Sequence, residues 1–179
     1  GENYDDYSGY SVSLSSDGNS IAIGAPENDG NGNGSGHVRV YDWNGSYWLK
    51  RGQDIDGETS NDRSGSSVSL SSDGNTLAIG APYNDRYPYG FNGSDFGHVR
   101  IYDWNGSSWL QRGQDIDGEA AYDASGFSIS LSSDGNTVAI GAPNNSWLNT
   151  SSSISGNNGY HAGHTRVYSW NGSSWLQIG

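Results

Sequence analysis

The sequence predicts an all-β protein that is built from three consecutive copies of one structural unit. The copies have the sequences SGYSVSLSSDGNSIAIGAP, SGSSVSLSSDGNTLAIGAP and SGFSISLSSDGNTVAIGAP, at Ser8–Pro26, Ser64–Pro82 and Ser125–Pro143. A run of Gly-His-x-Arg-x-Tyr-x-Trp-Asn-Gly follows each copy. Apolar residues do not recur at the spacings of three and four that a helix requires. Because a unit of this size cannot bury its faces alone, we expect copy to stack on copy.

The first half of each copy predicts two strands that are joined by a tight hairpin. In the first copy, Val12 and Leu14 alternate with serines, and Asp17-Gly18 then reverses the chain. The second strand, at 21–24, carries large residues on one face and Ala and Gly on the other. Small residues let a neighbouring sheet approach closely, and the proline that follows cannot continue a strand ladder.

The second half predicts two more strands, at 37–43 and 48–55 in the first copy. An Asn-Gly hairpin dipeptide joins them, and a tryptophan pair flanks it in every copy: Trp43/Trp48, Trp104/Trp109 and Trp170/Trp175. Four antiparallel strands with a face of small residues describe the blade of a β-propeller. We therefore predict three four-stranded blades at residues 1–56, 57–117 and 118–179, which together form one continuous repeat domain.

The repeated segments also resemble the FG-GAP repeat of integrin-type propellers. The likeness rests on Ser-Gly before an alternating strand, on Asp-Gly-Asn, and on Gly-Ala-Pro beginning at Gly24, Gly80 and Gly141. Serine stands where the family has the Phe of its Phe-Gly pair, and the calcium loop of many members is missing. The loop from Leu14 to Ser20 offers one carboxylate, whereas calcium takes about six to eight oxygen ligands. We therefore expect neither calcium nor another cofactor.

Composition argues against several classes of partner and activity. Twenty acidic residues against eight basic ones give a net charge of −12, which repels nucleic acids and anionic lipid surfaces. Cysteine is absent, and no apolar run is long enough to span a bilayer. The sequence has no phosphate-binding loop, no His-Glu-x-x-His and no chemical constellation that is confined to one blade. We expect no nucleic acid partner, no membrane insertion and no enzymatic activity.

Three blades are fewer than the four to eight that close an ordinary propeller. Gly179 aligns with Gly52 and Gly113, so the Gln-Asp-Ile-Asp segment that ends the first two copies does not follow it. Two uncovered blade faces and a shortened last strand form a heterologous pair of surfaces. We therefore expect self-assembly, head to tail, into a filament or a ring.

The loops after Gly-Ala-Pro differ in length between the copies, at 27–35, 83–96 and 144–162. Insertions at one point of every repeat map to one face, which is often a binding face. The second loop carries residues that suit a sugar or a protein surface: Tyr83, Arg86, Tyr87, Tyr89 and Phe91. These side chains also suit simple packing of their own loop. A second hypothesis is thus an adhesion or lectin-like module of a longer propeller that binds glycans or surface proteins.

Seven Asn-x-Ser/Thr sequons lie at predicted turns: Asn33, Asn44, Asn92, Asn105, Asn144, Asn149 and Asn171. Asn44, Asn105 and Asn171 share the same hairpin tip in their blades. Asn-Gly-Ser is also ordinary turn composition. If the source is a eukaryote, the density of sequons predicts a glycoprotein that is extracellular or at the cell surface.

Carboxylates recur near the ends of the first two copies, at Asp54, Asp56, Glu58 and Asp62 and at Asp115, Asp117, Glu119 and Asp123. A cation between blades and solvated carboxylates that discourage strand addition both fit this pattern, and we expect the second. Histidine recurs at the start of the third strand and is interpreted as a structural residue, while His161 and His164 lack a third ligand for zinc. We predict no metal site.

Overall fold

The computed structural model describes residues 1, 3–85, 95–145 and 162–179, which form fourteen β-strands and no helix. Blade 1 contains β1 (Ser11–Leu14), β2 (Ser20–Ala25), β3 (His37–Trp43), β4 (Trp48–Lys50) and β5 (Ile55–Asp56). Blade 2 contains β6 (Ser67–Leu70), β7 (Thr76–Ala81), β8 (His98–Trp104), β9 (Trp109–Gln111) and β10 (Ile116–Asp117). Blade 3 contains β11 (Ser128–Leu131), β12 (Thr137–Ala142), β13 (His164–Trp170) and β14 (Trp175–Ile178). The all-β prediction is confirmed.

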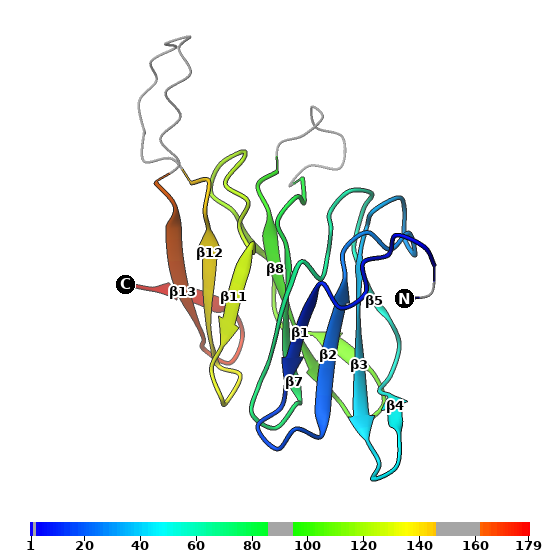
Figure 1. Cartoon of the computed structure of the whole chain (residues 1–179). Helices are drawn as coiled ribbons and strands as arrows, with labels where there is room; N and C mark the ends of the chain where they lie inside the picture. Colours follow the sequence, from blue (N-terminus) through cyan, green and yellow to red (C-terminus); the bar gives the residue numbers. More distant parts are fainter. Residues whose placement is uncertain (2, 86–94, 146–161) are drawn as a thin grey trace, which may run out of the picture.

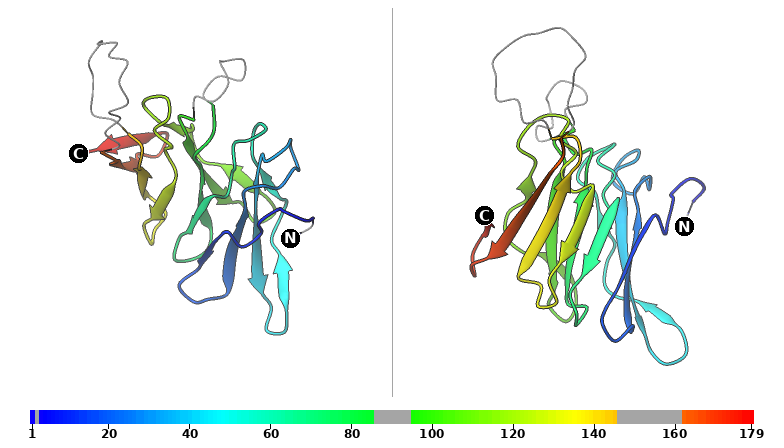
Figure 2. Two further views of the ribbon diagram at one scale, coloured as in Figure 1. Left: turned by 45° about the horizontal axis from the view of Figure 1, so that its top comes forward. Right: turned by 60° about the vertical axis from the view of Figure 1, so that its left-hand side comes forward.

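Each blade is an antiparallel meander in which the strands lie in sequence order, as in β1-β2-β3-β4. The three sheets stand side by side like the blades of a fan, with the first strands β1, β6 and β11 in contact at the inner side (Figures 1 and 2). They do not close into a ring, and the N- and C-termini lie on opposite sides of the array. The architecture is therefore propeller-like and open.

The predicted hairpins occur in the expected registers. Ser13 pairs with Ala22 across the first hairpin, and Trp43 pairs with Trp48 across the third turn. The two indole rings have centroids 5.5 Å apart, and the corresponding pairs of blades 2 and 3 repeat this geometry. Alternation and turn dipeptides were therefore sufficient to place these strands.

The outer strand differs from the prediction. The expected continuous strand 48–55 is divided into β4 and β5, which pair with opposite ends of β3. The break contains Gly52, whose φ of +78° lies in the left-handed region that glycine adopts without strain. A Cβ at this position would lie 2.6 Å from the Trp104 ring of blade 2. The break thus lets the outer edge of blade 1 approach the next blade.

The hydrophobic core lies between the blades. Ala22, Val38 and Val40 of blade 1 pack against a cluster of larger side chains of blade 2: Val68, Leu70, Leu77, Ile79, Tyr102 and Trp109. A second cluster joins Ala78, Val99, Ile101 and Ile116 of blade 2 to Val138, Ile140 and Trp175 of blade 3. In blade 2, we call the side that carries Val68, Leu77 and Trp109 the large face, and the side that carries Ala78 and Val99 the small face. The same names apply to the equivalent sides of blades 1 and 3. Each junction packs the small face of one blade on the large face of the next.

The closest approach between blades occurs at a glycine of the small face. A Cβ on Gly80 would lie 2.1 Å from the carbonyl oxygen of Gly126 and 2.3 Å from Ser67 Oγ. A Cβ on Gly141 would lie equally close to Ser128 Oγ, but its next nearest neighbour would be 3.6 Å away. Substitutions at Gly80 and Gly141 can therefore be compared to separate the contact between two blades from the contact within one blade.

We expect Gly80→Ala to destabilise the fold by about 1–3 kcal/mol more than Gly141→Ala, because the added methyl group must push two blades apart. Urea unfolding in dilute solution, followed by tryptophan fluorescence, measures the difference. Equal losses of stability in the two variants would contradict the close approach at Gly80.

Candidate functional site

The two internal blade junctions repeat the same polar contacts along the inner strands. Ser11 Oγ donates to the Gly65 carbonyl oxygen at 2.7 Å, and Ser67 Oγ donates to that of Gly126 at 2.7 Å. Two strand residues further on, Ser13 and Ser69 accept hydrogen bonds through Oγ from the backbone N–H groups of Leu70 and Leu131, at 2.9 Å and 3.0 Å. Each junction is therefore polar where the first strands of two blades meet, and apolar between the remaining strands.

The outer edge of each junction is held by tryptophan and arginine. Trp109 Nε1 donates to the Arg51 carbonyl oxygen at 3.0 Å, and Trp175 Nε1 donates to that of Arg112 at 2.9 Å. The guanidinium carbon of Arg51 also lies 4.9 Å from the ring centroid of Trp104, which is a cation–π distance. The tryptophans thus act within the junctions, as well as pairing across their own hairpins.

Among the described residues, no blade packs against the large face of blade 1. Val12 and Leu14 are 60% and 57% exposed, whereas their counterparts Val68 and Leu70 in blade 2 are 9% and 7% exposed. Trp48 is likewise exposed, although the equivalent Trp109 is buried. Blade 1 therefore presents an apolar surface with the composition that blades 2 and 3 bury.

The small face of blade 3 is open in the complementary way. Ser128 and Ser130 are exposed, although the equivalent serines of blades 1 and 2 contact the next blade. A surface hollow of about 430 Å³ lies here and is lined in part by Ser128, Gly141 and Thr165. The described chain therefore has one unoccupied large face and one unoccupied small face.

A pocket of about 380 Å³ lies among the ends of the blades. Of the predicted binding residues, Tyr83 lines it, and the Arg63 guanidinium stacks 4.8 Å from the Tyr83 ring centroid. Sequence reasoning missed most of the lining, which comes from the segments before β1, β6 and β11: Tyr7, Tyr10, Arg63, Ser66 and Phe127. Arg86, Tyr87, Tyr89 and Phe91 lie outside the described residues.

The sequons within the described part of the chain are exposed: Asn33, Asn44, Asn105, Asn144 and Asn171. At the tip of the β3–β4 hairpin, Asn44 Oδ1 accepts hydrogen bonds from the N–H groups of Ser46 and Tyr47 at 2.9 Å and 3.0 Å. The turn therefore uses the side-chain oxygen and none of these bonds involves Nδ2, the atom to which a glycan attaches. Asn92 and Asn149 lie outside the described residues.

The predicted edge carboxylates are more engaged than expected. Asp54 accepts two hydrogen bonds of 2.9 Å from Arg39 and contacts the Lys50 ammonium group, and these cations hold the pKa of its carboxyl well below the usual range. Asp62 is buried and accepts hydrogen bonds from Thr59. At these two positions the prediction of solvated carboxylates is wrong, because the acids organise the blade edge and its turn.

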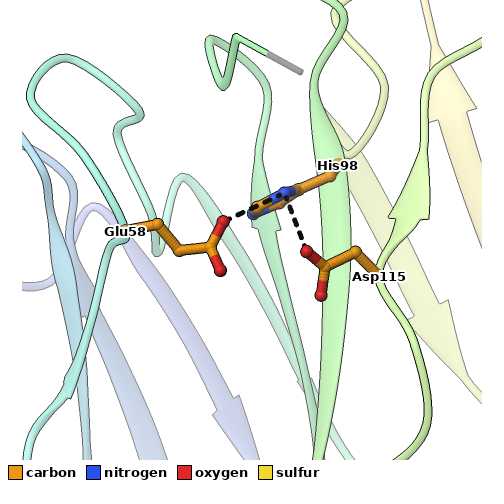
Figure 3. Close-up of side chains that lie close together, drawn as sticks. All are labelled: Glu58, His98 and Asp115. Atoms are coloured by element: carbon orange, nitrogen blue, oxygen red, sulfur yellow. Dashed lines mark ion pairs between the residues drawn. The ribbon is translucent and has the colours of Figure 1, made fainter. Parts of the chain in front are cut away.

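A side-chain cluster that the sequence did not reveal lies between blades 1 and 2. The imidazole of His98, at the start of β8, is placed between the carboxylates of Glu58 and Asp115 (Figure 3). His98 Nδ1 lies 3.9 Å from Glu58 Oε2 and 3.9 Å from Asp115 Oδ2. The only signal in the sequence was the recurrence of all three residue types in the repeats, which did not identify the blade in which they meet.

Burial governs the protonation of this cluster. Loss of solvent, followed by the nearby Arg100 charge, lowers the pKa of His98 to about 4, so the imidazole is neutral at pH 7. Loss of solvent raises the pKa of Glu58, and the neighbouring carboxylates of Asp115, Asp62 and Asp117 add to this effect while Arg100 opposes it. The cluster is thus a neutral imidazole between two carboxyl groups that repel one another.

Comparison with protein families identifies the repeat. The FG-GAP repeat matches residues 2–41 and 55–102, which run from β1 into β3 and from β5 into β8. The chain thus contains FG-GAP repeats. No curated protein sequence matches the chain. Within the described residues, the protein has no helix with the length and apolar character needed to cross a lipid bilayer.

Solved structures resemble this FG-GAP protein in fold. A candidate 6-phosphogluconolactonase from Bacteroides uniformis matches with a TM-score of 0.56 and 13% identity, covering 94% of this chain and 39% of its own. The acylaminoacyl peptidase of Pyrococcus horikoshii matches with a TM-score of 0.46 and 13% identity. An acylaminoacyl peptidase in complex with Z-Gly-Gly-Phe-chloromethyl ketone matches with a TM-score of 0.47 and 14% identity. Each of these two matches covers 94% of this chain and 24% of the peptidase chain. The first comparison supports the propeller-like fold alone, and this chain spans well under half of any of the three proteins.

Proposed function

We propose that this FG-GAP protein is an extracellular structural glycoprotein whose three-blade units join head to tail into a filament or a ring. The observation that carries the proposal is the pair of unoccupied blade faces. The large face of blade 1 is the face that blades 2 and 3 bury, and the small face of blade 3 is the face that blades 1 and 2 bury. A second copy placed by the same blade-to-blade step would cover the small face of one chain with the large face of the next, and further copies or ring closure would cover the remaining faces.

The inner edge supplies matched hydrogen-bonding groups for this contact. Gly9 corresponds to Gly65 and Gly126, and a Cβ added to Gly9 would meet no atom within 4 Å, whereas one added to Gly65 or Gly126 would meet the preceding blade. In a head-to-tail contact its carbonyl group would meet Ser128 Oγ, and the Leu14 N–H group would meet Ser130 Oγ. These pairings repeat the bonds of 2.7–3.0 Å that both internal junctions form.

The outer edge would form a modified version of the internal junction. Trp48 Nε1 would donate to the Ile178 carbonyl oxygen, as Trp109 does to that of Arg51. Ile178 occupies the position of Arg51 and Arg112, so an apolar contact replaces the cation–π contact with the tryptophan pair. Burial of exposed side chains such as Val12, Leu14 and Ile178 would drive the association.

The blade hairpin tips support the glycoprotein part of the proposal. Asn44, Asn105 and Asn171 lie at the tips of the third hairpins, at the opposite end of each blade from its Gly-Ala-Pro segment (Figure 1). Glycans there would add hydration along one rim without covering either open face. They would therefore permit end-to-end contact and hinder lateral association of exposed strands.

An alternative function is adhesion through the pocket among the blade ends. Tyr10 and Phe127 are 64% and 52% exposed, and with Tyr83 they surround a hollow large enough for a small ligand. Exposed aromatic rings beside Arg63 and Glu27 suit the apolar faces and hydroxyl groups of a sugar.

The assembly proposal predicts that the purified 19.0 kDa chain forms oligomers at micromolar concentration. Leu14→Asp should leave a folded monomer, because it places a charge in the contact and its side chain is already exposed in one copy. Leu110→Asp is the matched control, since Leu110 is 53% exposed on blade 2, away from both open faces. Sedimentation velocity and electron microscopy distinguish a filament from a compact six-blade dimer ring. A monodisperse wild-type monomer would refute the proposal.

The glycoprotein proposal predicts that material from the native source is heavier than the bare polypeptide. Intact mass spectrometry, followed by peptide mapping after glycosidase treatment, should assign glycans to Asn44, Asn105 and Asn171. A mass equal to that of the polypeptide would rule out glycosylation. Glycans found only at other sequons would contradict the proposed row of glycans at the hairpin tips.

The adhesion hypothesis predicts that Tyr83→Ala abolishes binding to glycans on an array while assembly is unchanged. Tyr122→Ala serves as the control, because Tyr122 is 59% exposed and does not line the pocket. Absence of any glycan binding by the wild-type chain, or equal binding by Tyr83→Ala, would count against the pocket as a sugar site.

A further inference from the structure

We propose that Glu58, His98 and Asp115 form a binding site for one divalent transition metal ion of the zinc type, at the junction of blades 1 and 2. This site is independent of the proposed assembly and departs from the expectation, drawn from the sequence, that the protein binds no metal. It also lies away from the hairpin between the first two strands, where the calcium loop of many FG-GAP repeats is found.

The three side chains already converge. One potential ligand atom from each residue lies within 4.8 Å of those of the other two, and the imidazole nitrogen Nδ1 is 3.9 Å from both carboxylates. Zinc takes nitrogen and oxygen ligands at about 2.0–2.2 Å, so an ion between them requires the groups to close slightly. Glu58 can supply this movement, because its long side chain is 43% exposed.

The carboxylates are oriented by neighbours that leave one oxygen of each toward His98. Gln111 Nε2 donates to Asp115 Oδ1 at 2.5 Å, while Asp115 Oδ2 faces the imidazole. Arg100 Nη1 lies 3.6 Å from Glu58 Oε1, while Glu58 Oε2 faces the imidazole. Residues that bind and orient the ligand side chains, as Gln111 and Arg100 do here, are characteristic of protein metal sites.

The buried His98 presents one ring nitrogen to this cluster. Its side chain is 2% exposed, and Nδ1 faces both carboxylates without forming a hydrogen bond within the described residues. An ion between the carboxylates would therefore bind Nδ1, and Nε2, which is also without a hydrogen-bond partner there, would carry the proton of the neutral ring.

The surroundings favour a cation with few protein ligands. A pocket of about 210 Å³ adjoins the cluster and leaves room for water as a further ligand. Its lining adds the oxygen-bearing side chains Thr59, Asn84, Asp85 and Asp117, and among the described residues no lysine or arginine lines it. Three convergent ligands, one of them imidazole, suit zinc and related ions, whereas calcium takes six to eight oxygen ligands.

The equivalent positions of the other blades are committed to different contacts. In blade 1, Arg39 and Lys50 occupy both oxygens of Asp54, the counterpart of Asp115. Gln111 replaces Lys50 in blade 2 and leaves one oxygen available. In blade 3, His164 Nε2 accepts a hydrogen bond from Arg166, which also pairs with Glu119. The described residues therefore predict one metal ion per chain.

Calorimetric titration of the metal-stripped 179-residue chain with Zn²⁺ tests the proposal. We expect one ion per chain for the wild type, and an affinity lower by at least about tenfold for Glu58→Gln, which removes a ligand at an exposed position. His98→Gln should have the same effect, and His164→Gln should bind as the wild type does. Circular dichroism verifies the fold of each variant, and Glu58→Gln keeps the test valid if His98→Gln does not fold.

Two further measurements distinguish the site from zinc bound elsewhere. Co²⁺ should give the visible absorption of a low-coordinate nitrogen and oxygen site, and Glu58→Gln should lose this absorption. Ca²⁺ should not compete with Zn²⁺. The proposal is overturned if the wild type binds no Zn²⁺, if binding is unchanged in Glu58→Gln and His98→Gln, if His164→Gln abolishes it, or if Ca²⁺ displaces Zn²⁺.

Discussion

The packing of a small blade face on a large blade face determines most of this structure. A single sheet of short strands has two faces and too few residues to cover either, so its apolar side chains are buried only when another sheet lies against it. Ala22 and Gly80 show what this requires, because their small size lets the next blade come within contact of the backbone. The close approach in turn allows the serine side chains of one inner strand to bond with the backbone of the next blade.

The same packing explains why each end of the described array exposes one blade face. A junction that repeats by one rotation always leaves the first large face and the last small face uncovered, unless the ring closes. The exposed Val12 and Leu14 are therefore a direct consequence of the repeat, and not an irregularity of one blade. The strand ends at which Gly-Ala-Pro begins, those of β2, β7 and β12, all lie at the same end of the array (Figure 1).

Because the blades repeat, a difference in sequence between equivalent positions of two blades can be related directly to a difference in their contacts. Blades 1 and 2 have the same histidine, arginine and aspartate at equivalent positions, yet the Asp54 carboxylate is held by two cations, and the Asp115 carboxylate is oriented by an amide. Where blade 1 has Lys50, blade 2 has Gln111, which leaves one oxygen of Asp115 facing His98 in the metal site that we propose. Comparable scaffolds can acquire sites in this way, through one substitution beside a repeated set of polar groups.

The sequence by itself determined the all-β class, the repeat, the hairpins and the face of small residues, because alternation and turn dipeptides act over a few neighbouring residues. Tertiary structure decided the break at Gly52, which depends on the Trp104 ring of another blade. It also decided the pocket that joins Tyr10 to Phe127, and the meeting of Glu58 with His98. These groups are far apart in the chain, and only the distance and angle between packed blades bring them together.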